Sequence, residues 1–242
     1  MDLLDLSLSI LSLTILEIIL GIDNLVFLSI LTEKLPVTER KQARYWGLCF
    51  AWITRLMLLA SAVWIVHLTE PLLTIQGHSL SARDIFLLSG GAFLIMKATQ
   101  EIHFEFEEQD ADAPPKRSSA KKFKAVVLQV ALMDVIFSLD SVLTAIGLTT
   151  NFWVMGIAIT IAILIMIYAS NPVGNFVEKH PTVRMLALSF LILIGTMLVA
   201  DGLSFHVPRG YLYFAMGFSL TVESLNLLRH DRKKKAKLRK KM

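Results

Sequence analysis

Residues 17–30 read Glu-Ile-Ile-Leu-Gly-Ile-Asp-Asn-Leu-Val-Phe-Leu-Ser-Ile, so two carboxylates and an amide interrupt an otherwise almost purely apolar run. A similar run occurs at 134–147, which reads Asp-Val-Ile-Phe-Ser-Leu-Asp-Ser-Val-Leu-Thr-Ala-Ile-Gly. Each copy places two carboxylates six residues apart and follows the second with a small polar residue. Because an ionised group is costly at membrane depth, two matching insertions of this kind predict a functional site.

The composition indicates an all-α membrane protein. The chain has 242 residues, of which 55% are hydrophobic and 18% are charged, whereas soluble domains carry about 25% charged residues. Helices are expected because a chain in lipid must satisfy its own backbone hydrogen bonds. The single cysteine, Cys49, excludes a disulfide framework and a cysteine-rich metal site.

Seven stretches are long and apolar enough to be transmembrane helices, each of which needs roughly 20 residues. Pro36 is predicted to interrupt the helix between the first two stretches, and the fifth stretch is predicted to end before Asn171-Pro172. Charged residues with Pro114-Pro115 predict a mobile linker at 102–122. The predicted spans are 6–31, 46–66, 85–101, 123–148, 152–170, 185–200 and 210–228.

Basic residues predict the orientation of these spans in the membrane. The first, third and fifth connections carry four, five and two Lys or Arg, and the tail at 229–242 carries nine. The second, fourth and sixth connections carry one, none and one. The positive-inside rule therefore places the N-terminus outside and the C-terminus in the cytoplasm. A basic tail directly after a transmembrane helix favours anionic lipid over nucleic acid as its partner.

The two motifs lie in the first and fourth spans, and their neighbours also match. Residues 47–61 and 156–170 both begin with Gly and end in Ala-Ser, with Leu164 at the place of Arg55. The third and sixth spans share a serine and a carboxylate at the same separation. Since three spans per repeat is an odd number, two inverted repeats are predicted, as in many secondary transporters. The predicted parts are 1–101 (first repeat), 102–122 (cytoplasmic linker), 123–202 (second repeat), 203–228 (seventh helix) and 229–242 (cytoplasmic tail).

The polar residues of the two motifs are predicted to converge on one metal site. Residues seven apart share a helix face, which aligns Glu17 with Asn24. A helix break at Gly21, with a matching break at Ser138, would bring in the second carboxylates. All the donors are oxygens, which suit Mg²⁺, Ca²⁺ or Mn²⁺. The predicted ligands are Glu17, Asp23, Asn24, Asp134, Ser138, Asp140 and Ser141.

An alternative is that the carboxylates form structural ion pairs with Arg55 and Lys97, the charged side chains within the second and third spans. Two cations against four carboxylates leave a surplus of negative charge, which favours ion binding and gives Arg55 and Lys97 a supporting role. Arg55 is expected either to tether one carboxylate or to line the ion pathway. Three carboxylates at span ends are expected to be interfacial and solvated, namely Glu101, Asp201 and Glu223.

The sequence resembles the TerC family of integral membrane proteins, and in particular its short YgdQ-like bacterial members, within the LysE-type exporter superfamily. The matching segments are 16–24, 134–142, 97–103, 177–181 and 207–216, and Asp201 stands where many relatives have Glu. The family is named for tellurium resistance, and several members are implicated in Mn²⁺ efflux or in metal loading of secreted proteins. The resemblance implies an inner-membrane protein whose motif residues handle a metal.

These observations favour a secondary transporter that exports a divalent cation, Mn²⁺ above others, in exchange for protons or another ion. No tightly bound cofactor is expected. The alternatives are an exporter of another small solute or oxyanion, and a non-transporting membrane adaptor that docks through its linker and tail. An enzyme is disfavoured because the chain has no recognisable nucleophile, Gly-rich loop or nucleotide motif.

Overall fold

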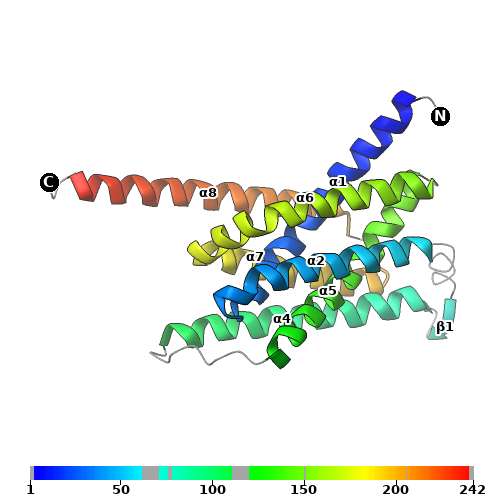
Figure 1. The fold of residues 1–242 in the computed structure, drawn as a ribbon. Helices are drawn as coiled ribbons and strands as arrows, with labels where there is room; N and C mark the ends of the chain where they lie inside the picture. Colours follow the sequence, from blue (N-terminus) through cyan, green and yellow to red (C-terminus); the bar gives the residue numbers. More distant parts are fainter. Residues whose placement is uncertain are drawn as a thin grey trace.

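The protein is almost entirely helical in the computed structural model, which describes residues 3–61, 71–75, 78–110, 120–149, 151–205 and 207–239. These residues form seven helices and one antiparallel pair of strands (Figure 1). The helices are α1 (Leu3–Glu33), α2 (Val37–Ala60), α4 (Ala82–Asp110), α5 (Ala120–Leu148), α6 (Phe152–Lys179), α7 (Pro181–Gly202) and α8 (Arg209–Arg239), and the strands are β1 (Pro71–Ile75) and β2 (His78–Ser81).

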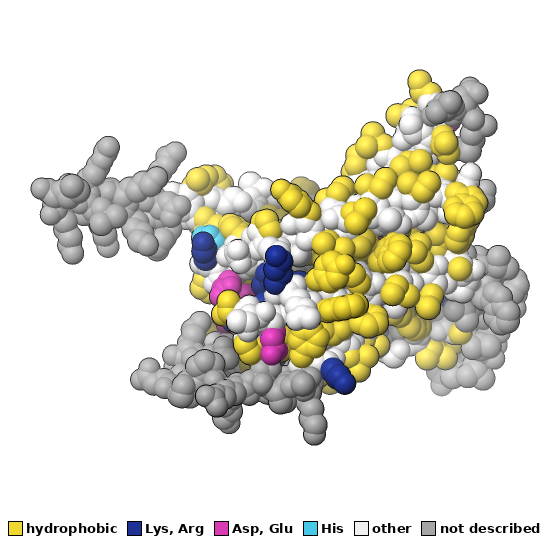
Figure 2. All heavy atoms as spheres, viewed as in Figure 1, with side chains coloured by type: hydrophobic (Ala, Val, Ile, Leu, Met, Phe, Trp, Pro, Cys, Tyr) yellow, Lys and Arg dark blue, Asp and Glu magenta, His cyan; other side chains and the backbone are white. Residues whose placement is uncertain are grey.

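Four of the described helices contain a stretch that is long and apolar enough to cross a membrane, namely α1, α4, α6 and α7. Large apolar side chains also lie on the outside of the bundle, including Trp46 and Phe50 on α2 and Phe214 on α8. Figure 2 shows hydrophobic side chains over the middle of one face, with charged side chains gathered toward the end from which α8 extends. A continuous exposed apolar surface marks contact with lipid, which supports the predicted class of membrane protein.

Two helices, α4 and α7, run antiparallel and approach each other closely at Gly91 and Gly195. The carbonyl oxygen of Gly195 would lie 2.5 Å from a Cβ added at Gly91, and the carbonyl of Gly91 would lie 2.8 Å from one added at Gly195. Asp84 at the start of α4 meets Gly202 at the end of α7. Backbones can approach this closely only where both helices lack side chains.

Around this pair, α1 packs on α6, and α2 packs on both α5 and α6 (Figure 1). α2 and α6 run antiparallel, since Trp52 donates a hydrogen bond to Thr160 and Arg40 pairs with Glu178 near the opposite end. Weaker contacts join α1 to α5 and to α7, and α4 to α5. α8 contacts α7 and then extends beyond the bundle (Figure 1).

The predicted helix breaks at Gly21 and Ser138 are wrong, because α1 and α5 are continuous through these positions. Gly21 instead lets α6 approach: a Cβ added there would lie 2.5 Å from Sδ of Met166. The predicted end of the fifth span before Pro172 is also wrong, since α6 continues to Lys179. The extension places Gly174 against the guanidinium of Arg44. The helix continues although Pro172 has no backbone N–H and therefore lacks one helical hydrogen bond.

Two connections also differ from their predictions. The connection between the second and third spans contains the β1–β2 pair, which the sequence did not indicate. The predicted linker at 102–122 is helical at both of its ends, since α4 runs to Asp110 and α5 begins at Ala120, and 111–119 lie outside the described residues. After the predicted seventh span, α8 continues into the basic tail as far as Arg239; the sequence made no prediction of secondary structure there.

We predict that Gly91→Ala lowers the thermal unfolding midpoint of the detergent-solubilised protein, because its new Cβ meets the backbone of α7. Overpacking of this kind costs about 1–3 kcal/mol. Gly217→Ala on α8 is the control, since no heavy atom lies within 4 Å of its added Cβ. It should leave the midpoint unchanged or raise it, and equal loss in the two variants would contradict the packing described.

Candidate functional site

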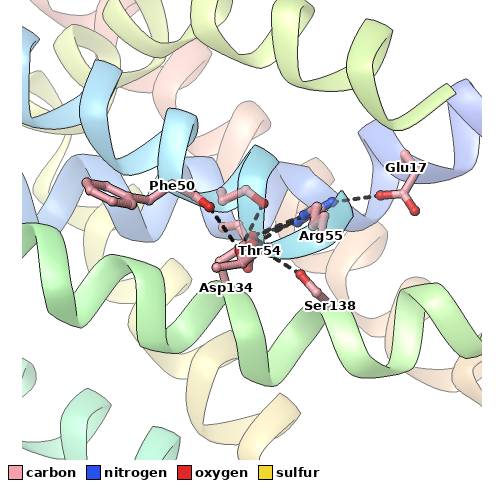
Figure 3. Close-up of polar contacts among 8 residues, drawn as sticks. Glu17, Phe50, Thr54, Arg55, Asp134 and Ser138 are labelled. Carbon is pink, nitrogen blue, oxygen red and sulfur yellow. Dashed lines mark hydrogen bonds and ion pairs between the residues drawn. The ribbon is translucent and has the colours of Figure 1, made fainter. Parts of the chain in front are cut away.

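The centre of the bundle contains Arg55 of α2 between two carboxylates from the two sequence motifs (Figure 3). Its Nη1 donates to Oε2 of Glu17 on α1 at 2.7 Å, and its Nη2 donates to Oδ1 of Asp134 on α5 at 2.7 Å. The Arg55 Nε also lies 3.2 Å from Oδ1 of Asp134 and 3.3 Å from Oδ2. Glu17, Arg55 and Asp134 are 1%, 2% and 5% exposed.

Two further predicted residues join this group through Asp134. Ser138, one turn later on α5, donates from Oγ to Oδ2 of Asp134 at 3.1 Å. Asn24 donates from Nδ2 to Oδ1 of the same carboxylate at 3.4 Å, across the α1–α5 interface. The predicted alignment of Glu17 and Asn24 on one face of α1 is therefore confirmed, because both contact the Arg55–Asp134 pair.

Several acceptor atoms of the site are left without a hydrogen bond. Oε1 of Glu17 and Oδ1 of Asn24 are buried and have no hydrogen-bond partner within the described part of the chain. The Thr14 hydroxyl, three residues before Glu17 on the same face of α1, is also buried without a hydrogen-bond partner among the described residues. Buried polar atoms are normally hydrogen-bonded, so these oxygens identify places where a water, proton or cation would be stabilised.

The group of described side chains does not include the remaining three predicted ligands. Asp23 lies on α1, and Asp140 and Ser141 lie on α5, but their side chains are outside the described residues. Lys97 lies on α4 and forms no ion pair with another described side chain. Among the described residues, no cluster of three His, Cys, Asp or Glu side chains has metal-site geometry. Among the described side chains, the centre is thus an ion-paired triad of Glu17, Arg55 and Asp134.

A second polar group, which we name the charged end cluster, lines a cavity of about 230 Å³ at one end of the bundle. Lys34 and Glu101 lie 2.6 Å apart, Arg40 and Glu178 lie 2.8 Å apart, and Arg184 pairs with both Glu105 and Glu33. The cluster joins the ends of α1, α4 and α6 to the beginnings of α2 and α7. Its members are Glu33, Lys34, Arg40, Glu101, Glu105, Glu178 and Arg184.

Sequence reasoning missed this cluster. The expectation that Glu101 is solvated is wrong, because its side chain is 6% exposed and paired with Lys34. The available signal was the presence of opposite charges just outside the ends of three predicted spans. Those spans end on the same side of the membrane under the predicted topology, so their flanking charges were candidates for ion pairs.

Comparison with known proteins gives one family. A family model described as "Integral membrane protein TerC family" matches residues 4–238. The UPF0053 inner membrane protein YgdQ of Escherichia coli is 50% identical over 221 residues, which are 91% of this chain and 92% of the relative. A UPF0053 protein of Haemophilus influenzae is 45% identical, covering 90% of this chain and 92% of its own length. The UPF0053 protein YegH of Escherichia coli is 50% identical, covering 90% of this chain and 41% of its own length. No solved structure matches.

We predict that Asp134→Ala destabilises the fold strongly, because it leaves the buried Arg55 with a single carboxylate. Breaking a buried ion pair from one side costs about 3–5 kcal/mol. Glu178→Ala is the control, since it breaks an ion pair whose carboxylate is 45% exposed and which is worth about 0–1 kcal/mol. Thermal unfolding in detergent measures both, and similar midpoints would contradict the central role of Asp134.

Proposed function

The chain belongs to the TerC family of integral membrane proteins, and from that premise we propose that it exports a divalent metal cation, Mn²⁺ above others, across the bacterial inner membrane. Transport is secondary and uses exchange with protons or another ion. The proposal has the N-terminus outside and the C-terminus in the cytoplasm, as the distribution of basic residues indicates.

The observation that carries this proposal is the meeting of Glu17 and Asp134 at one buried point. Both are motif carboxylates, they come from helices more than 100 residues apart in sequence, and a single guanidinium stands between them. Two carboxylates against one Arg leave a net negative charge in the centre of the bundle. The nearby unsatisfied atoms are oxygens that can accept or coordinate, which suits a hard cation and disfavours an oxyanion.

The pattern of helix contacts supports two inverted repeats. Exchange of the repeats replaces α1, α2 and α4 by α5, α6 and α7. Under this exchange the α1–α6 contact becomes the α2–α5 contact, and the α1–α7 contact becomes the α4–α5 contact, and all four are present. The α4–α7 and α2–α6 pairs map onto themselves and run antiparallel, as an axis in the membrane plane requires.

In this arrangement the charged end cluster lies at the cytoplasmic mouth. Glu33 at the end of α1 follows Glu17 by 16 residues, or about 24 Å along a helix. The cluster has four carboxylates and three basic groups, and Arg44 beside Glu33 and Glu178 balances its charge. Its four carboxylates line the cavity and offer oxygens to an incoming cation. Its ion pairs join five helix ends, and opening them would admit a cation from the cytoplasm.

We expect the reconstituted wild-type protein to carry Mn²⁺ across liposome membranes, measured by quenching of an enclosed metal-sensitive dye. Asp23→Asn and Asp140→Asn remove the second carboxylate of each motif and should lower the initial rate by about tenfold or more, as loss of a metal-site group commonly does. The control is Asp201→Asn, at the end of α7 and outside both motifs.

Two results would contradict the proposal. Wild-type rates from Asp23→Asn and Asp140→Asn would show that the second carboxylates of the motifs do not handle the cation. Absence of Mn²⁺ flux from folded wild-type protein, with a pH gradient imposed in either direction, would favour a different solute or a non-transporting adaptor. Flux of an amino acid or of tellurite would distinguish these two.

A further inference from the structure

Arg55 lies where a cation bound by both motif carboxylates would have to lie. Its guanidinium bonds to Glu17 on one side and to Asp134 on the other (Figure 3). The two carboxylates occupy equivalent places in the two motifs, but Arg55 has no equivalent: the aligned residue of α6 is Leu164. Each repeat thus supplies one of the two carboxylates, but only the first repeat supplies the basic side chain between them.

A divalent cation and Arg55 compete for the same oxygens. Two positive groups close together in a partly buried site repel each other, so a cation and Arg55 cannot both bind Glu17 and Asp134 at full strength. The triad with Arg55 retains a net negative charge, whereas a divalent cation would neutralise the two carboxylates. Since Arg55 is covalently fixed to α2, its concentration at the site is constant, and it returns whenever the cation leaves.

The two halves of the triad are bound unequally. Arg55 uses both Nε and Nη2 on Asp134, but a single nitrogen, Nη1, on Glu17. The second oxygen of Glu17 has no hydrogen-bond partner among the described atoms, and the buried Thr14 hydroxyl lies on the same helix face. A bidentate pair is stronger than a single bond, so Glu17 is the carboxylate that a cation captures first.

We propose that Arg55 is an internal counter-cation, which holds the two motif carboxylates together when no divalent cation is bound and is displaced from Glu17 when one enters. The proposal rests on the cation transport proposed above and adds the residue that limits affinity and promotes release. It also explains why the triad is buried yet unsatisfied: the site is only partly neutralised by its own Arg and is completed by the transported ion.

The test compares Mn²⁺ binding to purified wild-type protein, Arg55→Gln and Arg55→Lys, by titration in detergent at fixed pH and ionic strength. Arg55→Gln should bind Mn²⁺ more tightly by about tenfold or more, which corresponds to about 1.4 kcal/mol, and should transport it more slowly because release is impaired. Arg55→Lys keeps a competing charge without the bidentate geometry and should have an intermediate affinity. Mn²⁺ should raise the unfolding midpoint of Arg55→Gln more than that of wild type.

Arg44→Gln is the matched control, because Arg44 is a second buried arginine of α2 whose Nε donates to Thr32 outside the triad. It should lose stability without any gain in Mn²⁺ affinity. If Arg55 were purely structural, Arg55→Gln would behave in the same way, and an affinity equal to or weaker than wild type would overturn the proposal. Should Arg55→Gln fold neither with nor without Mn²⁺, unchanged or weaker affinity in Arg55→Lys overturns it.

The result also separates this proposal from the proposed function. Wild-type Mn²⁺ flux together with no gain of affinity on loss of Arg55 rejects the counter-cation role alone. If wild type shows no Mn²⁺ flux, and neither wild type nor any variant binds Mn²⁺ at millimolar concentration, the transport function and the counter-cation role are rejected together.

Discussion

A guanidinium buried between two carboxylates constrains the whole bundle. Arg55, Glu17 and Asp134 come from three helices, and none of them can be buried alone without a large desolvation cost. Their bonds fix the relative height and rotation of α1, α2 and α5. Hydrophobic packing between these helices is not directional, so the triad supplies the specificity that apolar side chains lack.

Other contacts among the described residues hold this centre in place. The glycine contact between α4 and α7 brings two backbones together on one side of the bundle. The charged end cluster joins five helix ends around a polar cavity. The protein therefore combines a glycine-packed helix pair, a charged cluster at one end of the bundle and a central triad.

Much of the helical architecture could be predicted from hydropathy, because each observed helix overlaps one predicted apolar span. The helix ends could not. Pro172 and Gly21 are locally helix-breaking, but contacts made by Gly174 with Arg44 and by Gly21 with Met166 outweigh local preference. These contacts join residues far apart in sequence, so no local pattern reports them.

The site was predicted in its composition more accurately than in its geometry. Helical periodicity correctly placed Glu17 and Asn24 on one face of α1, whereas the meeting with Asp134 of α5 was expected from the internal repeat. The bridging role of Arg55 depends on how α2 packs between the two motif helices, which the sequence does not specify. The burial of Glu101 likewise depends on a partner, Lys34, that belongs to a different helix end.

The most direct test of the central claim is to locate the ion. Anomalous diffraction at the manganese edge, from crystals of the protein grown with Mn²⁺, measures the position of bound metal without assuming its ligands. The account predicts a peak between α1 and α5, in contact with carboxylate oxygens of Glu17 and Asp134, with Arg55 withdrawn from Glu17. A peak elsewhere, or an intact Glu17–Arg55–Asp134 triad in protein that has bound Mn²⁺, would contradict it.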